Sequence, residues 1–245
     1  MDRSYLSDQQ VVAVSREFVC ARLITFENSD EAKLMKRLFG GRRLVNTVFT
    51  IMDPAGKSAL IRAGRSPTML FDDAAAMANK MRAVAKRYPG RKQVAAKDLG
   101  LPVLADVRIA LNVTECDAQQ LVILRGDDKQ VKELRQKLTE LSWSEKLIGR
   151  FLYAVADDQT DWQVLKGADK AAKAGVLIAR SDQYGLTGEI VASAKATATA
   201  AQLEKALLAA VASHKPDVVD TRRLRRQGIR KGVQWQSELS PGKGR

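Results

Sequence analysis

Residues 18–26 read FVCARLITF, a nearly continuous apolar run that is rich in strand-forming residues. A run of this kind is typical of a β-strand that is buried on both faces of a sheet. Helical patterns flank it on both sides. We expect one helix over residues 8–17 and another over residues 30–39, the second capped by Ser29. The sequence therefore predicts the order helix, strand, helix.

The rest of the first half predicts a hairpin and a third helix. Residues 47–52 and 58–63 are short strand-forming runs, joined by the turn-forming sequence DPAGK at 53–57. Residues 72–88 carry apolar side chains at helical spacing. The order predicted over residues 1–90 is therefore α-β-α-β-β-α.

The second half repeats this order with one more strand in front. We expect a helix over residues 103–112 and then a short buried strand with the sequence LVIL at 121–124. The remaining expected elements are a helix at 129–141, a strand at 150–156, hairpin strands at 176–179 and 189–192, and a helix at 198–213. Two units of similar order indicate an internal duplication. Strands that alternate with helices and end in a hairpin predict an α/β fold with a mixed sheet.

Positive charge is concentrated in two stretches of the chain. The formal net charge is +13, and residues 80–98 and 215–245 each contribute +6. The densest cluster, with a nearby aromatic residue, is predicted to bind a partner: Arg222, Arg223, Arg225, Arg226, Arg230, Lys231 and Trp235. Such a segment can dock on an acidic protein surface or contact nucleic-acid phosphates, and the alternative is a solvated tail without a partner. No base-reading motif accompanies it, which favours a protein partner.

Few residues could carry catalysis or hold a metal. Cys20 and Cys116 are the only cysteines and His214 is the only histidine, which argues against a CxxC pair, a zinc site or a nucleophile–histidine pair. We therefore predict no catalytic residue, no metal site and no cofactor. Cys20 lies in the apolar run and is expected to be a small buried residue. The alternative is a lone reactive thiol beside Arg22.

Two stretches of the first half carry a resemblance to a known family. They are residues 1–23, which include MDRSYLSD and FVCARL, and the hairpin sequence TVFTIMDPAGK at 47–57. Both are similar to segments of bacterial thioredoxin-like proteins, in which a helix, a strand and this hairpin follow the reactive CxxC pair. The resemblance implies two tandem thioredoxin-like domains, at residues 1–90 and 103–214, with a basic linker at 91–102 and a basic tail at 215–245. The second domain matches only in its order of elements.

The resemblance also locates the reactive groups of the family, and this chain departs from the family at each position. The CxxC of the family lies where a strand meets a helix N-terminus, which lowers the thiol pKa. The corresponding residues of the second unit are RGDDKQ at 125–130, without sulfur. The family also has a cis-proline before the hairpin, but residues 44–47 (LVNT) and 173–176 (KAGV) contain no proline.

The first domain is expected to lack its first strand. Met1 aligns just after the position of the CxxC, so the strand that is central in the family is missing. Its loss would expose unpaired backbone groups and apolar surface. Either the gene product extends upstream of Met1, or another segment fills the gap.

These observations lead to three hypotheses about function. We favour a non-catalytic, redox-inactive scaffold or protein-interaction subunit, because CxxC and cis-proline are missing and there is one histidine. The first alternative is a thiol–disulfide oxidoreductase whose CxxC lies upstream of Met1. The second is an accessory nucleic-acid-binding protein that uses the basic linker and tail. No apolar run reaches the ~20 residues of a membrane-spanning helix. We expect a cytoplasmic location if Met1 is the true start, and export if a signal sequence lies upstream.

Overall fold

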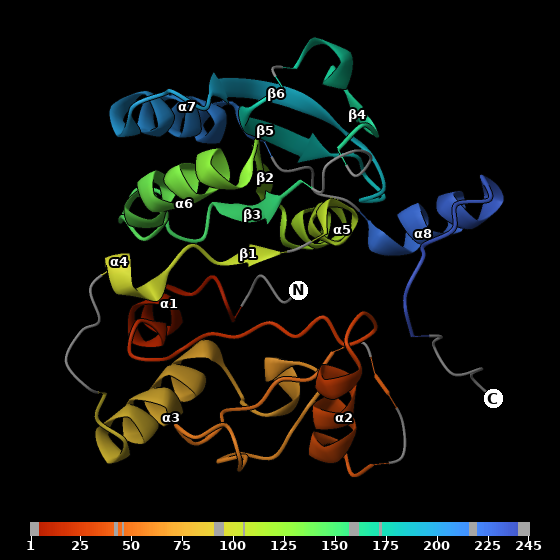
Figure 1. Ribbon diagram of the computed structural model, residues 1–245. Coiled ribbons are helices and arrows are strands. Elements are labelled where there is room, and N and C mark those ends of the chain that lie inside the picture. Colours follow the sequence, from red (N-terminus) through yellow and green to blue (C-terminus); the bar gives the residue numbers. More distant parts are fainter. Residues whose placement is uncertain are drawn as a thin grey trace. The chain divides into compact units, whose positions relative to one another are not determined.

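The chain divides into two compact units in the computed structural model (Figure 1). Unit 1 comprises Met1–Gln93 and Gln236–Arg245, and unit 2 comprises Val94–Trp235. The structure describes residues 5–41, 44–45, 47–90, 96–104, 106–156, 162–171, 173–215 and 220–239.

Unit 2 is an α/β domain with a six-stranded mixed sheet in the order β1-β3-β2-β5-β6-β4. The strands are β1 (Val103–Leu104), β2 (Gln120–Arg125), β3 (Phe151–Val155), β4 (Leu165–Lys166), β5 (Gly175–Ser181) and β6 (Gly188–Lys195). Strand β2 lies between β3, to which it is parallel, and β5, to which it is antiparallel. The mixed α/β architecture predicted from the sequence is therefore confirmed for this unit.

Helices cover both faces of this sheet (Figure 1). The helices of unit 2 are α4 (Ala96–Leu99), α5 (Val107–Asp117), α6 (Asp128–Ser142), α7 (Ala200–Ser213) and α8 (Thr221–Arg230), with a short 3-10 turn at Ala168–Lys170. Helices α6 and α7 share one apolar core with Val122 and Leu124 of β2. Helix α5 packs in a second core with Leu121 and Ile123, because successive residues of a strand point to opposite faces.

The four apolar residues of β2 are all 0% exposed. Burial of a leucine, isoleucine or valine side chain contributes about 1.5–3 kcal/mol each, so this strand alone contributes on the order of 10 kcal/mol before entropy is counted. The prediction that LVIL forms a short buried strand is correct.

The described part of unit 1 contains three helices, of which α1 and α3 pack on a small apolar core. The three helices are α1 (Gln9–Ser15), α2 (Ser29–Leu38) and α3 (Ala74–Arg87), with a 3-10 turn at Pro67–Met69. The buried core residues are Val11, Val14, Ile51, Met77, Ala78 and Met81. The Tyr5 hydroxyl donates to the carbonyl oxygens of Phe71 and Asp72, at 3.0 and 2.9 Å, and so ties the start of the chain to this core.

The strand predicted at residues 18–26 is not formed. Residues 19–24 have no regular secondary structure, residues 25–27 form a turn, and Val19 is 98% exposed. The prediction that Cys20 is buried was also wrong, because a strand is buried only when neighbouring strands and helices cover it. The expected hairpin is reduced to two isolated antiparallel bridges, Phe49 with Gly64 and Met52 with Ala59.

Three smaller predictions need correction. Helix α2 begins one residue earlier than expected, because the Asn28 side chain caps it rather than Ser29. Residues 103–112 are not one helix, since Asp106 caps α5 and β1 precedes it. The basic tail expected at 215–245 contains a helix, since residues 221–230 form α8, capped by Asp220. Short helix α4 also lies inside the expected linker, of which residues 91–95 fall outside the described part.

We predict that the two units differ in their ability to fold alone. A fragment of residues 94–235 should unfold in one cooperative urea transition, because its central strand is paired on both edges and buried on both faces. A fragment of residues 1–93 should unfold broadly, because residues 18–26 join no sheet. Far-ultraviolet circular dichroism measures both transitions. A sharp transition for residues 1–93 would contradict this prediction.

Candidate functional site

The site begins at the turn between β5 and β6. The Asp182 carboxylate accepts hydrogen bonds from the backbone N–H groups of Tyr184, Leu186 and Thr187. Gly185 has a φ of +67°, and a Cβ atom there would lie 2.7 Å from Cα of Asn112 in α5. Only glycine therefore fits at position 185, because the turn packs directly against the backbone of α5.

This turn presents Tyr184 as an anchor for the C-terminal segment of unit 2. The indole Nε1–H of Trp235 donates to the Tyr184 carbonyl oxygen at 2.9 Å, and the two rings meet edge-on with centroids 6.2 Å apart. Gly228 of α8 is buried here, since a Cβ atom on it would lie 3.1 Å from the Tyr184 ring. The Lys231 ammonium lies 5.9 Å from the centre of the same ring. Helix α8 is thus held by one side on a fixed aromatic platform.

The other side of α8 is a surface of exposed arginines. Arg222, Arg225, Arg226 and Ile229 follow the spacing i, i+3, i+4, i+7 and line one shallow hollow. We call these four residues the α8 stripe. Arg223, Arg230 and Lys231 extend the positive charge around the helix and are also exposed. Within the part of the chain that the structure describes, no ion pair involves the α8 arginines.

The charges of the α8 stripe oppose its own helix. Like charges three and four residues apart destabilise a helix by a few tenths of a kcal/mol per pair, and a ten-residue helix is marginal in water. The Asp220 side chain offsets part of this cost by accepting from the N–H groups of Arg222 and Arg223, at 2.9 and 3.2 Å. Packing of Gly228 on Tyr184 provides the remaining support. An anion bound at the stripe would relieve the repulsion.

The residues predicted from the sequence divide into two groups. All five arginines and Lys231 lie on α8 or directly after it, and their charges are exposed together. Trp235 does not join them, because its indole packs on Tyr184 of its own unit. Sequence reasoning missed Ile229 as part of the stripe, although its helical spacing from the arginines was a usable signal. It also missed Tyr184, for which the sequence holds no signal.

The end of β2 holds an arginine–tryptophan contact. The Arg125 guanidinium lies over the Trp162 ring, 3.3 Å from its centre, and partial burial lowers the pKa of Arg125 below its ordinary value. The next residues start α6, where Asp127 and Gln130 form a reciprocal capping box. Residues 125–130 thus provide a guanidinium stacked on an aromatic ring and a capped helix N-terminus, and they contain no cysteine.

The two thiols lie apart from this position and are both free and exposed. Although Cys20 is exposed as a residue, its sulfur faces the end of α1, 3.9 Å from the Ser15 carbonyl oxygen, and desolvation of the sulfur there raises the pKa of the thiol. A raised pKa leaves less thiolate at neutral pH, which is the opposite of what a reactive cysteine needs. Among the described residues, no group of three acidic, histidine or cysteine side chains could hold a metal ion.

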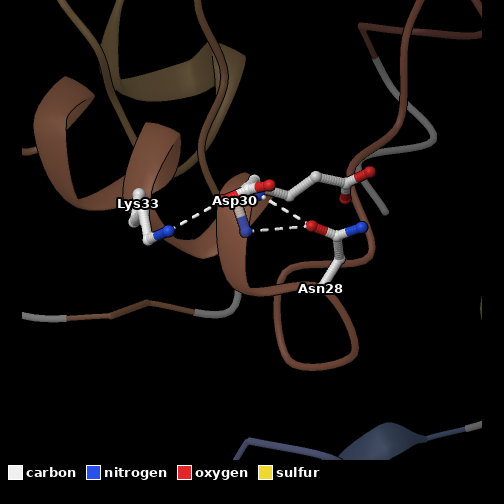
Figure 2. Close-up of polar contacts among 4 residues, drawn as sticks. Asn28, Asp30 and Lys33 are labelled. Atoms are coloured by element: carbon white, nitrogen blue, oxygen red, sulfur yellow. Dashed lines mark hydrogen bonds and ion pairs between the residues drawn. The ribbon is translucent and has the colours of Figure 1, made fainter.

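Polar contacts in unit 1 order the start of α2 (Figure 2). The Asn28 side chain accepts from the N–H groups of Asp30 and Glu31, at 2.9 and 3.1 Å. A hydrogen bond and ion pair with Lys33, at 2.8 Å, lowers the pKa of Asp30. This pair is exposed and therefore adds little stability. The Glu31 carboxylate also accepts the N–H of Ile24, which fixes the end of the irregular segment at residues 19–24.

Comparison of this chain with family models, with curated proteins and with solved structures finds no match. The search for membrane-spanning helices, restricted to the residues that the structure describes, finds none of sufficient length and apolar character.

We predict that Trp235→Ala releases α8 from unit 2. The substitution removes the hydrogen bond to Tyr184 and the ring contact that hold a marginal helix, so the backbone amides of residues 224–231 should exchange at least tenfold faster. Hydrogen exchange followed by mass spectrometry measures this. Ile229→Ala, on the outward side of α8, serves as the control and should leave the exchange nearly unchanged. Equal protection in both variants would show that Trp235 does not anchor the helix.

Proposed function

We propose that this chain is a non-catalytic, thioredoxin-like interaction protein that docks on the acidic surface of another protein through α8. The observation that carries the proposal is the α8 stripe, a set of exposed arginines held on a fixed platform without acidic partners among the described residues. A protein does not gain stability from such a cluster, because its charges repel. The cluster is explained if a partner supplies the counter-charge.

The thioredoxin-like part of the proposal is supported by the order of elements in unit 2. A central strand, β2, ends at the N-terminus of α6, and a hairpin of β5 and β6 followed by α7 completes the domain. These are the positions that the resemblance assigns to the reactive pair and to the elements behind it. Residues 125–130 contain no cysteine, and no cis peptide bond occurs among the described residues. This argues for a domain used as a scaffold.

A protein partner is favoured over a nucleic acid by Ile229. Its side chain is 63% exposed and lines the same hollow as Arg222, Arg225 and Arg226. An apolar side chain surrounded by guanidinium groups fits an amphipathic acidic segment, which offers both carboxylates and an apolar anchor. A phosphate backbone offers charge alone.

A second candidate function is thiol–disulfide exchange by a CxxC upstream of Met1. The observation in its favour is the apolar sequence at residues 18–26, which joins no sheet in the described part of the chain. The sequence upstream of Met1 in the reading frame decides this candidate, because a CxxC encoded there would support it.

We expect the chain to bind an acidic amphipathic helical peptide at 150 mM salt, measured by fluorescence anisotropy. The variant Arg222→Gln/Arg225→Gln/Arg226→Gln should weaken this binding about tenfold, since three exposed ion pairs together contribute about 1–2 kcal/mol and 1.4 kcal/mol is a factor of ten. A control with the same loss of charge is Lys129→Gln/Lys132→Gln/Arg135→Gln on the exposed side of α6, which should change binding less than twofold.

The same assay with duplex DNA separates the two kinds of partner. Ile229→Ser should weaken binding of the peptide and leave any DNA binding unchanged. Tighter binding to DNA than to the peptide, with no effect of Ile229→Ser, would replace this proposal with a nucleic-acid function. Absence of binding to either probe would contradict a docking role for α8.

We also expect the chain of 245 residues to be silent in thiol exchange. Cys20 and Cys116 form no CxxC, and the raised pKa of Cys20 disfavours its thiolate, so reduction of insulin by dithiothreitol should proceed at the rate of the blank. Turbidity follows the reaction. Acceleration that is lost in Cys20→Ser would make Cys20 a reactive thiol and contradict a purely non-catalytic role.

A further inference from the structure

A shallow hollow of about 560 Å³ opens on the surface of unit 1. It is lined by Leu38 and Phe39, at the end of α2, and by residues 59–63, which form the second arm of the hairpin. Ligand pockets in proteins have volumes of about 300–1,000 Å³, so its size is sufficient for a small ligand or for the end of a peptide. None of the described residues that line it is acidic.

Large apolar side chains form one part of the lining. Leu38 and Phe39 are partly exposed, and neither belongs to the core of unit 1 or to the apolar residues that pack against this core. Leu60 and Ile61 complete the apolar part, and they also pack against the core. The hollow therefore presents an apolar surface that is supported from below. A ligand side chain placed on this surface would remove it from water, which is favourable.

The hairpin side of the hollow also offers hydrogen-bond donors. Of residues 59–63, only Leu60 donates its backbone N–H within the described part of the chain, at 2.7 Å to the Ile51 carbonyl oxygen. The other four N–H groups of this stretch have no acceptor there. The chain bends at Leu60 and Ile61. Successive N–H groups at a bend of the backbone are suited to bind the oxygen atoms of an anion.

Arg62 adds a positive charge to the same stretch. Its Nη2 donates to the Met69 carbonyl oxygen at 2.7 Å, which holds the side chain in one position. A guanidinium group has five N–H donors, so several remain for a ligand. No acidic side chain pairs with Arg62 among the residues that the structure describes. The guanidinium is therefore available to a carboxylate, with which arginine forms strong, charge-assisted hydrogen bonds.

We infer that this hollow binds the C-terminal end of a partner polypeptide. The last side chain of the partner lies on the apolar surface, and its terminal carboxylate binds Arg62 and the N–H groups of residues 59–63. Ile61 and Arg62 are neighbours in the chain, so the apolar and anionic groups of the ligand must also be close together. In a C-terminal residue both groups are attached to one Cα atom. Capture of a terminal carboxylate by backbone N–H groups is a common mode of peptide recognition. The inference concerns unit 1 and is independent of the α8 proposal.

The test measures binding of a fluorescein-labelled peptide, GSGSVL with a free C-terminal carboxylate, to the full chain by fluorescence anisotropy. The same peptide with an amidated C-terminus should bind about tenfold more weakly, because it lacks the charge that pairs with Arg62. Arg62→Gln should weaken binding of the free-acid peptide by a similar factor and leave the amidated peptide unaffected. Lys57→Gln, which removes the same charge from the turn of the same hairpin, serves as the control and should change binding less than twofold.

The apolar part of the hollow is tested with Leu38→Ala/Phe39→Ala. This variant should weaken binding of GSGSVL about fivefold or more, because the last side chain of the peptide loses its contact surface. Its thermal unfolding should stay close to that of the unchanged protein, since neither residue belongs to the core. The peptide GSGSVS makes the same test from the side of the ligand, without any change in the protein, and should bind as weakly.

Several results would overturn the inference. The first is absence of binding at about 1 mM protein, or equal binding of the free-acid and amidated peptides. The second is tight binding of amidated GSGSDL, which would assign Arg62 to an acidic side chain. The third is displacement of the peptide by laurate at an equal concentration, which would make the ligand a fatty carboxylate. The fourth is a dimeric mass in light scattering that is lost in Leu38→Ala/Phe39→Ala, which would assign the hollow to a second copy.

The two proposals are read separately. The variant Arg222→Gln/Arg225→Gln/Arg226→Gln should bind GSGSVL as tightly as the unchanged protein does, because its substitutions lie on α8. Arg62→Gln should in turn leave binding of the acidic helical peptide unchanged. Failure of one proposal therefore leaves the other intact.

Discussion

The structure of unit 2 depends on the complete burial of β2. Its backbone is paired on both edges, with β3 and β5, and its side chains fill the cores on both faces. The antiparallel partner β5 leads to the turn that carries Tyr184, which in turn holds Trp235 and α8. The exposed arginines therefore depend for their position on contacts that lead from the buried strand β2 through β5 and Tyr184 to α8.

The described part of unit 1 contains no strand of this kind. Its helices are formed and its core is present, but the hairpin is reduced to two bridges and residues 18–26 join no ladder. Helices form because their hydrogen bonds are local, whereas a strand needs partners from elsewhere in the chain. The contrast between the units thus follows from the difference between local and distant pairing.

The same difference explains how much the sequence could predict. Apolar residues at helical spacing located α3, α6 and α7, and the LVIL run located β2, because these patterns depend on local geometry and on burial. The similarly apolar run FVCARLITF was misread, since its sequence does not show whether other strands pair with it. Helix α8 was not predicted, because Leu224 and Ile229 are its only large apolar residues among the arginines and its sequence also contains a glycine. The cluster of arginines was visible in the sequence, but its anchor on Tyr184, 51 residues from Trp235, was not.

The mutual repulsion along the α8 stripe couples its order to ionic strength in a particular way. In the free protein, added salt screens the arginines from one another and so favours the helix. The same screening weakens their attraction to carboxylates on a partner. High salt therefore stabilises α8 in the free protein and at the same time weakens the binding of an acidic partner to it. At low ionic strength, carboxylates of the partner that we propose would take the place of the salt ions, so that binding would also stabilise α8.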